Sequence, residues 1–533
     1  MHWFDELLGR IEEFLLNKDK VLCNAGLSVS GLQHVGRLRG EIALGHAIVR
    51  ELRGKGKRAQ QSLVLYTQDQ WKGKEAQLAR FRAGEGEQYI GRRLIDVPDP
   101  EGCHKNWVDH YWVDFGGQLD RFAPGISVVS TTEVYAMKEM KDLVLELIGK
   151  KEEVREVINK YRGRKPYPPG WIPFEAYCEK CRRVGSAETI EVMADHTVRY
   201  ECGCGGSGVS SIENGKLNWR LEWPALWKVL KVDVEPFGKD HASPGGSRDS
   251  CKEIAQSLMG FEPPFPIPYE WVGLGQGGKD LGDMGSSDFV GFTPKQWIEI
   301  GDPEVIRYPY FFNPVSRRVV LDLGKVDAYH DTYDTAERAY HTAERDEEQQ
   351  IAARSFELAQ VDVTMEEMPY QLSYRHAAYL SQISPPEKRL RWCIDRLKDT
   401  GMLSIPLTPF EEGRMERRIA QAARWVQLYS PENRVVLLEK LTDEIRGSLD
   451  DRDRAALGTY LQAAAKAEWR EEAIKESMVA LTKGGNLPVE TPRFFRDLYL
   501  VLLGRERGPR AAPFLAVLKK DWVLQRLGDA SKP

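Results

Sequence analysis

The residues with the clearest chemical potential lie between Ala25 and Arg37, in a turn rich in glycine and serine. An apolar run over residues 20–24 precedes the turn, and a helical pattern begins near His34. Free backbone N–H groups and the helix dipole at such a junction favour phosphate. His34 adds an imidazole, and Gly36 lets the backbone approach a ligand closely. The segment predicts a nucleotide phosphate site, although a strand–helix turn without a ligand fits the same residues equally well.

A second set of reactive side chains is formed by four cysteines. Cys178 and Cys181 are followed after twenty residues by Cys202 and Cys204. Two close thiol pairs at this separation predict a tetrahedral, structural Zn²⁺ site, with His196 as an alternative ligand and four unpaired thiols as the other interpretation. The remaining cysteines are predicted to be buried apolar side chains: Cys23, Cys103, Cys251 and Cys393.

A third stretch combines aromatic and charged residues. Trp219 and Trp223 flank Glu222, and Asp240 follows in a Gly-Lys-Asp-His sequence. A tryptophan face can hold an ammonium group, and Glu222 could accept a hydrogen bond from that ammonium. Asp240 suits the hydroxyl groups of a ribose. Each tryptophan taken alone fits core packing at least as well.

The elements that must position these residues are strands alternating with helices. Residues 62–66 and 126–130 are predicted strands with polar residues directly after them, and residues 35–53 and 143–161 are predicted helices. Polar residues beyond the carboxyl ends of parallel strands indicate a ligand site. From Pro294 onward the periodicity is mostly helical, including a polar helix over residues 335–358.

Composition limits the class of protein. The 533 residues carry a formal net charge of −5, which excludes a globally basic nucleic-acid coat but not local basic faces. No apolar run reaches the roughly 20 residues of a membrane span, and the N-terminus has no signal-peptide pattern. Eight cysteines in this length do not indicate a disulfide scaffold. We therefore expect a cytoplasmic protein that does not bind membranes.

Together these motifs resemble the class I lysyl-tRNA synthetase family over essentially the whole chain. The first turn resembles that family's HIGH signature. Further matches are Trp219-Arg-Leu-Glu-Trp223, Glu235-Pro-Phe-Gly-Lys-Asp-His241, Gly245-Gly-Ser247, the cysteine pairs and Gly508-Pro-Arg510. The Glu-Pro-Phe-Gly-Lys-Asp-His block is the most specific of them.

The resemblance implies an α/β Rossmann-type (HUP-like) catalytic domain with a zinc-binding insertion, followed by a mainly α-helical anticodon-binding region. The implied domains are residues 1–293 with an insertion at about 165–217, a connecting stem-contact-like domain at 294–385, and an anticodon-binding domain at 386–533. The implied reaction activates L-lysine with ATP and Mg²⁺ and transfers the lysyl group to tRNA-Lys.

The resemblance also implies roles for individual residues. The lysine pocket would contain Gly26, Ser28, Trp219, Glu222, His241 and Tyr269. ATP would contact Ser28, His34, Gly36, Arg37, Gly238, Asp240, His241 and Met284. The catalytic set would be His34, Gly36, Lys279, Ser286 and Ser287, and the zinc ligands the four paired cysteines.

The chain departs from the family in the second signature loop. Asp288 stands where the family carries a mobile lysine, and Asp283 stands where a basic residue is usual. A carboxylate beside phosphates repels them unless a cation bridges the two. Lys279, a few residues upstream, and Arg37, where the family usually has asparagine, are the candidate compensating cations.

The helical third of the chain carries features suited to RNA. Basic residues cluster at two places: Lys388, Arg389, Arg391 and Arg396, and then Arg505, Arg507 and Arg510. Such groups favour phosphate contacts, and aromatic side chains stack on unpaired bases. The candidate stacking residues are Phe410, Trp425, Trp469 and Phe514, although most aromatics at helical spacing belong to cores.

Two alternatives remain open. A tRNA-binding paralogue with impaired catalysis would explain Asp288. A small-molecule nucleotidyl transferase would share the first turn, but it would have no need of the helical region with its basic clusters.

Overall fold

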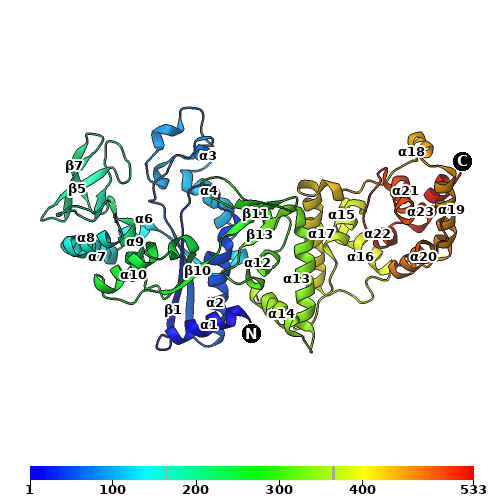
Figure 1. Ribbon diagram of the computed structural model, residues 1–533, viewed down its shortest axis with the longest axis horizontal. Coiled ribbons are helices and arrows are strands. Elements are labelled where there is room, and N and C mark those ends of the chain that lie inside the picture. The colour runs from blue at the N-terminus through cyan, green and yellow to red at the C-terminus, as the bar shows by residue number, and fades with distance from the viewer. Residues whose placement is uncertain (164, 363–365, 533) are drawn as a thin grey trace. The chain divides into compact units, whose positions relative to one another are not determined.

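The computed structural model describes residues 1–163, 165–362 and 366–532 (Figure 1). These residues form two compact units. The first comprises residues 1–298, 302–322 and 336–364, and the second comprises residues 299–301, 323–335 and 365–533. The three-part division anticipated from the sequence remains a prediction, and its middle part includes residues 363–365, outside the described residues.

The first unit is built on a five-stranded parallel sheet. Its strands, in the order β10-β9-β1-β2-β3, are β10 (Phe265–Tyr269), β9 (Val234–Gly238), β1 (Lys20–Leu27), β2 (Arg58–Leu65) and β3 (Ser127–Ser130). β1 and most of β2 are buried along their length, as expected for strands covered on both faces. The predicted strands and the α/β class are confirmed.

The strand order reverses beside β1, and the region at the carboxyl ends of β1 and β9 is here named the crevice. The chain runs from β1 to β2 and β3 on one side, and then returns to β9 and β10 on the other. The connections after β1 and β9 therefore diverge at the carboxyl ends of these two adjacent strands. Open α/β sheets bind ligands at this switch point.

The helical segment after β1 contains three helix types in succession. Residues Val35–Leu38 form a 3₁₀ turn, Arg39–Leu44 a π-helical tract, and α2 (Gly45–Gly54) an ordinary α-helix. The predicted start near His34 is confirmed, but the first ten residues are not α-helical. Gly40 faces Tyr269 so closely that an added Cβ would lie 2.1 Å from its ring, so the tract accommodates the aromatic side chain. Such π segments are frequent at functional sites.

Further helices connect the remaining strands. They are α3 (Glu75–Leu78), α4 (Trp107–Gly116), α5 (Leu119–Phe122), α6 (Thr131–Ala136), α7 (Lys138–Gly149), α8 (Lys151–Lys160), α9 (Trp219–Leu230) and α10 (Ser247–Ser257). The single helix predicted over residues 143–161 is wrong: α7 and α8 are separated at Lys150. The break lets Leu147 of α7 and Ile158 of α8 both reach one core.

The cysteine-containing insertion is a small β module. β4 (Phe174–Ala176) pairs with β8 (Gly215–Leu217), and β5 (Ala187–Val192), β6 (Thr197–Cys202) and β7 (Ser207–Ser211) form a separate antiparallel sheet. Another sheet contains β11 (Val272–Gln276), β12 (Lys279–Asp283) and β13 (Val319–Asp322). Gly277 and Gly278 have positive φ in the turn that joins β11 to β12.

The first unit is completed by α1 (Trp3–Phe14), α11 (Pro294–Ile298), α12 (Pro303–Phe312) and α14 (Glu347–Ala359). Arg354 of α14 bonds to Asp5 of α1 at 2.8 Å and to Glu51 of α2 at 2.8 Å. The polar helix predicted over residues 335–358 is in fact two helices, α13 (Val326–His341) and α14, because Asp346 caps a new start at α14.

The second unit is helical, as its periodicity predicts. Its helices are α15 (Tyr374–Ile383), α16 (Arg389–Asp399), α17 (Pro409–Leu428), α18 (Asp443–Ser448), α19 (Asp451–Lys466), α20 (Glu471–Lys483), α21 (Thr491–Leu503), α22 (Ala511–Val517) and α23 (Lys520–Ala530). Leu457, Phe494 and Phe514 are fully buried in its core. Over the residues that the structure describes, no helix combines the length and apolarity needed to cross a bilayer.

Candidate nucleotide site

His34 lies where β1 leaves the sheet. Its imidazole is buried, and its Nδ1 atom has no hydrogen-bond partner among the described residues. Gly36 and Gly291 flank it: an added Cβ at Gly36 would lie 2.8 Å from Nδ1, and one at Gly291 would lie 2.8 Å from the Cβ of His34. Burial, and secondarily Arg37, lower the pKa of His34 to about 3. The imidazole is therefore neutral at pH 7.

The residues at the carboxyl end of β1 pack closely against the residue that follows β2. Gly26 faces Tyr66, the residue after β2, and an added Cβ would lie 2.5 Å from its ring. Ser28 follows β1 directly and is half-buried. Both residues are at the crevice, as the sequence predicts, and a larger side chain at Gly26 would displace Tyr66.

The ends of β9 and β10 form the opposite wall. Gly238 and Tyr269 are register partners at the last positions of these strands, and an added Cβ at Gly238 would lie 2.7 Å from the carboxylate of Asp240. His241 packs its ring 5.1 Å from that of Trp223. Burial acts to lower the pKa of Arg37, but Glu41, Tyr269 and Asp240 raise it overall. Polar groups from both adjacent strands thus converge at the crevice.

The second loop packs against the first. Met284 follows β12, and Gly285 and Val290 exchange backbone hydrogen bonds across a tight turn. An added Cβ at Gly31 would lie 2.4 Å from the carbonyl oxygen of Ser286, so the two loops touch. The buried Ser286 hydroxyl has no hydrogen-bond partner among the residues described here. Ser287 donates to Asp288 at 3.4 Å.

Both unexpected carboxylates of this loop are paired. Lys74, the residue preceding α3, places its Nζ 2.8 Å from Asp288. Arg318, just before β13, bonds to Asp283 at 2.5 Å and to Asp280. The sequence did not reveal either partner, because Lys74 is 214 residues from Asp288. Each position where a negative charge replaces a positive one is therefore next to a cation from another segment.

The cations anticipated from the sequence are placed differently. Arg37 bonds to Glu41 at 3.0 Å, so its charge is matched within its own helix. Lys279 opens β12 and is exposed, in register with Gln276. Among the described residues, the cation paired with Asp288 is Lys74 rather than Arg37 or Lys279.

Glu222 belongs to a buried charged cluster. Lys216 Nζ lies 2.8 Å from Glu222 and 3.6 Å from Asp69, and both Lys216 and Glu222 are almost inaccessible to solvent. Burial raises the pKa of the nearby Glu175, while Lys216 opposes that shift. Three carboxyl groups thus surround one ammonium. Trp219, at the start of α9, is 43% exposed and stacks with Arg220.

Glu235 is the buried acid of the Glu-Pro-Phe-Gly-Lys-Asp-His block. It accepts hydrogen bonds from the indoles of Trp223 at 3.0 Å and Trp227 at 2.6 Å, and it lies 3.5 Å from Arg248. These bonds fasten α9 to β9. Trp223 is buried in this packing, as the alternative interpretation of the tryptophans anticipated.

The protonation of Glu235 gives a pH-dependent stability. Burial raises its pKa from 4.5 to about 7, although Arg248 opposes the shift. Between these two values the folded state binds the proton that the unfolded state has lost. Stability therefore falls as pH rises through this window, by at most ~1.4 kcal/mol per unit. Urea titrations from pH 5 to 8 should show this fall in the native protein and a flatter profile in Glu235→Gln; equal slopes would contradict the assignment.

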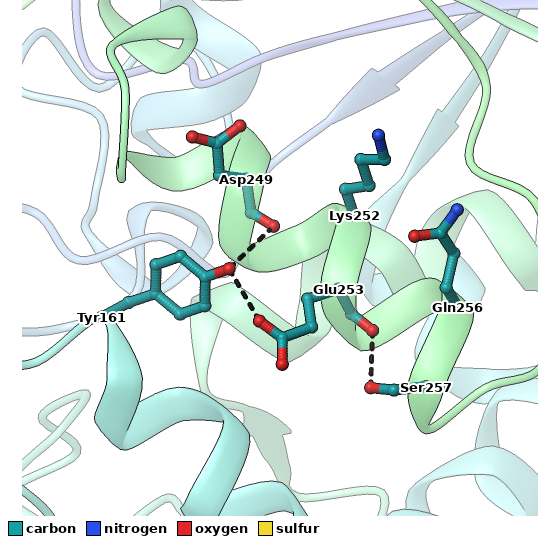
Figure 2. A pocket seen from close by; sticks show the side chains of 6 residues that line it. All are labelled: Tyr161, Asp249, Lys252, Glu253, Gln256 and Ser257. Atoms are coloured by element: carbon teal, nitrogen blue, oxygen red, sulfur yellow. Dashed lines mark hydrogen bonds between the residues drawn. The ribbon is translucent and has the colours of Figure 1, made fainter.

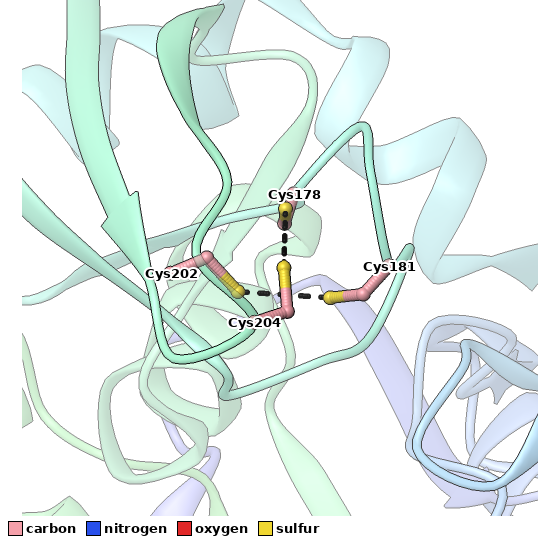
Figure 3. Close-up of side chains that lie close together, drawn as sticks. All are labelled: Cys178, Cys181, Cys202 and Cys204. Carbon is pink, nitrogen blue, oxygen red and sulfur yellow. Dashed lines mark hydrogen bonds between the residues drawn. The ribbon is translucent and has the colours of Figure 1, made fainter.

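The four paired cysteines converge in the insertion (Figure 3). Sγ of Cys178 lies 3.7 Å from Cys204, and Sγ of Cys181 lies 3.6 Å from Cys202. Tetrahedral Zn²⁺ with thiolate bonds of about 2.3 Å requires sulfurs roughly 3.8 Å apart. His196 lies in the turn between β5 and β6 and is not part of this group. The donor set therefore fits a closed zinc site. The sequence interpretation of Cys103 as a buried apolar side chain is wrong, because the thiol is exposed.

A separate open pocket lies outside this site. It measures about 540 Å³ and lies beside α10, lined by Tyr161, Asp249, Lys252, Glu253, Gln256 and Ser257 (Figure 2). Tyr161 donates to Glu253 at 2.7 Å, so these two polar groups of the pocket are already paired. None of the residues predicted for ligand binding lines it.

The aromatic residues proposed to stack on bases differ in exposure. Trp425 and Phe514 are buried in cores, so for them the stacking prediction is wrong. Trp469 donates its indole N–H to Leu518 at 2.9 Å. Phe410 is 45% exposed and Trp469 is half-buried, so these two of the four remain candidates for stacking.

A crevice at the switch point of a parallel sheet, covered by a second loop that touches the first, is the arrangement of a nucleotide-binding α/β protein. The family model described as tRNA synthetases class I (K) matches residues 1–362. The chain belongs to this family of class I tRNA synthetases.

Relatives extend the similarity over the full length. A lysine–tRNA ligase from Aeropyrum pernix is 42% identical, with 100% of this chain and 98% of that protein covered. The lysine–tRNA ligase from Pyrococcus horikoshii is 30% identical, with 99% of each chain covered. A solved glutamate tRNA ligase from Elizabethkingia meningosepticum covers 96% of this chain and 99% of its own, at 12% identity and a TM-score of 0.38.

Proposed function

We propose that this protein is a lysine–tRNA ligase acting in the cytoplasm. A carboxylate oxygen of L-lysine attacks the α-phosphorus of ATP, the bond to pyrophosphate breaks, and lysyl-adenylate forms. A ribose hydroxyl of the 3′-terminal adenosine of tRNA-Lys then attacks the lysyl carbonyl carbon, and AMP leaves. Mg²⁺ accompanies the phosphates.

The activation site supports this proposal through its two touching loops. ATP would lie in the crevice at the carboxyl ends of β1 and β9. The residues proposed to contact it from the β1 side are Ser28, His34, Gly36 and Arg37, and those from the β9 side are Gly238, Asp240 and His241. His34 is neutral, and its Nδ1 has no partner within the part of the chain that the structure describes, so it suits hydrogen bonding to phosphate. Met284, Ser286 and Ser287 would lie beside the phosphates of ATP. Lys279 remains a candidate cation for the pyrophosphate.

The observation that favours lysine is the excess of carboxyl groups near Tyr66. Asp69, Glu175 and Glu222 outnumber the single ammonium of Lys216. Burial raises the pKa of Tyr66 well above its usual value, and Glu235, Glu222 and Asp69 add to that shift. Gly26 packs directly against that tyrosine. A cationic side chain entering past Gly26 would therefore meet a negative region, with Trp219, His241 and Tyr269 as further pocket residues.

The paired carboxylates argue against the impaired paralogue. Lys74 pairs with Asp288, and Arg318 is shared by Asp283 and Asp280, so these cations reduce the negative charge that the second loop presents to pyrophosphate. The helical unit argues against a small-molecule transferase, because its exposed Lys388, Arg391, Arg507 and Arg510 suit RNA phosphates. We assign anticodon binding to residues 386–533 and a structural Zn²⁺ to the four paired cysteines.

The test is ATP–pyrophosphate exchange with each amino acid in turn, with and without tRNA. Lysine should support exchange, and His34→Ala should lower its rate by about 10²–10³-fold, as for loss of a group that stabilises transition-state charge. No exchange together with tRNA binding would indicate the paralogue. Exchange with a compound other than an amino acid, without RNA binding, would indicate the small-molecule enzyme.

A further inference from the structure

The second loop contains a residue in a strained conformation. Phe289 has a φ of 57°, in the left-handed region that a bulky side chain rarely adopts. Its backbone N–H bonds to the carbonyl oxygen of Ser286 at 3.3 Å, so it closes the turn that contains Ser286 and Ser287. A residue persists in such a conformation only where its surroundings hold it there. The contacts of Phe289 must therefore offset the strain.

The ring of Phe289 lies in a cage made by Arg80, Trp107 and Tyr111. The Arg80 guanidinium lies 4.0 Å from the ring centroid. Trp107 and Tyr111, both in α4, meet the ring edge-on at centroid distances of 6.2 and 5.2 Å. Edge-to-face aromatic pairs and a cation over a ring are both attractive. The ring also lies against the first loop, because a Cβ added at Gly31 would be 3.0 Å from it.

The elements that form the cage also hold the first loop. Trp107 donates its indole N–H to the carbonyl oxygen of Val29 at 3.2 Å. Gln77 of α3, two residues before the caging arginine's neighbour, donates to the carbonyl oxygen of Ser30 at 2.7 Å. The strained ring and the backbone of the first loop are therefore fastened to the same two segments of the chain.

We propose that Phe289 is a positioning residue, whose caged ring holds the second loop against the first before ATP binds. This inference rests on the activation function proposed above. Ser286 and Ser287 would then lie beside the phosphate site in the free protein, so ATP does not have to order them on binding. A ligand that binds only the ordered form loses affinity in proportion to the fraction of molecules that are ordered. The ring therefore acts on ATP affinity through the loop.

Amide hydrogen exchange of the full-length protein without ligand tests the anchor. Phe289→Asn removes the ring and keeps a residue that tolerates the left-handed conformation, whereas Tyr111→Ala opens the cage. Each should accelerate exchange over residues 284–290 by about 10-fold. Tyr111→Phe, which keeps the edge-on ring, is the matched control and should exchange as the native protein does. Equal rates in all four proteins would overturn the proposal.

The ATP affinity of the same four proteins tests the consequence. Calorimetric titration with ATP and Mg²⁺ should give a dissociation constant about 10-fold higher for Phe289→Asn and Tyr111→Ala than for the native protein and Tyr111→Phe. In lysine-dependent exchange the KM for ATP should rise by the same factor, while kcat stays near the native value.

The outcomes separate the anchor from the enzyme's proposed activity. A loop that exchanges hydrogen faster while ATP binds with native affinity would overturn the positioning role. A native protein that binds ATP and shows the expected differences, but supports no lysine-dependent pyrophosphate exchange, would uphold the anchor and refute the ligase function alone.

Discussion

Replacing Lys74 with alanine is expected to lower lysine-dependent ATP–pyrophosphate exchange by about 10²-fold. The change removes the Lys74 Nζ that lies 2.8 Å from the Asp288 carboxylate, in the loop proposed to lie beside the pyrophosphate. An uncompensated carboxylate would repel the charge that develops on the leaving group. The loss should appear mainly in the rate of activation, measured under saturating lysine and ATP.

Reversing the loop charge provides the decisive comparison. Asp288→Lys in the Lys74→Ala background places the cation in the loop itself and should recover most of the activity. Lys72→Ala, an exposed lysine two residues away, is the matched control and should behave as the native protein. If Lys74→Ala exchanges pyrophosphate at the native rate, Asp288 does not need this partner.

Replacing Glu222 with glutamine is expected to raise the KM for lysine by about 10²-fold and to destabilise the protein. Glu222 is 2.8 Å from Lys216 and both are buried, so the change leaves a buried ammonium without its carboxylate. Breaking such a pair costs about 3–5 kcal/mol. The same change removes negative charge from the region proposed to attract the substrate ammonium.

A double variant separates the two effects. Lys216→Met combined with Glu222→Leu removes both charges, so most of the stability in urea should return. The raised KM for lysine should remain, because the Glu222 carboxylate is still absent. Recovery of the native KM together with stability would show that the pair only supports folding, and that lysine is recognised elsewhere.

Local patterns predicted the sheet and the first loop well. The apolar runs became β1, β2 and β3, and the helix after β1 starts beside His34 as its spacing indicates. These features depend on residues close together in the chain, where hydrophobic periodicity and glycine placement are informative. The cysteine pairs were visible for the same reason.

The electrostatic partners could not be predicted in this way. Lys74 meets Asp288 across 214 residues, and Arg318 meets Asp283 across 35. Neither pair follows a helical or strand spacing, so only the assembled fold brings them together. Lys216 is six residues from Glu222, but its burial depends on β8 packing against the core. The sequence therefore indicated a loop with unpaired carboxylates, whereas the fold brings a cation next to both Asp288 and Asp283.

The π-helical tract Arg39–Leu44 has a consequence for orientation. An α-helix advances about 100° per residue, and a π-turn contains one extra residue within the hydrogen-bonded loop. The residues before the tract are thereby rotated about the helix axis relative to a continuous α-helix. The buried face of α2 fixes the helix against the sheet, while the tract sets independently the direction from which His34 and Gly36 face the crevice. A change within this tract would therefore reorient the site that we propose for ATP while α2 keeps its buried face.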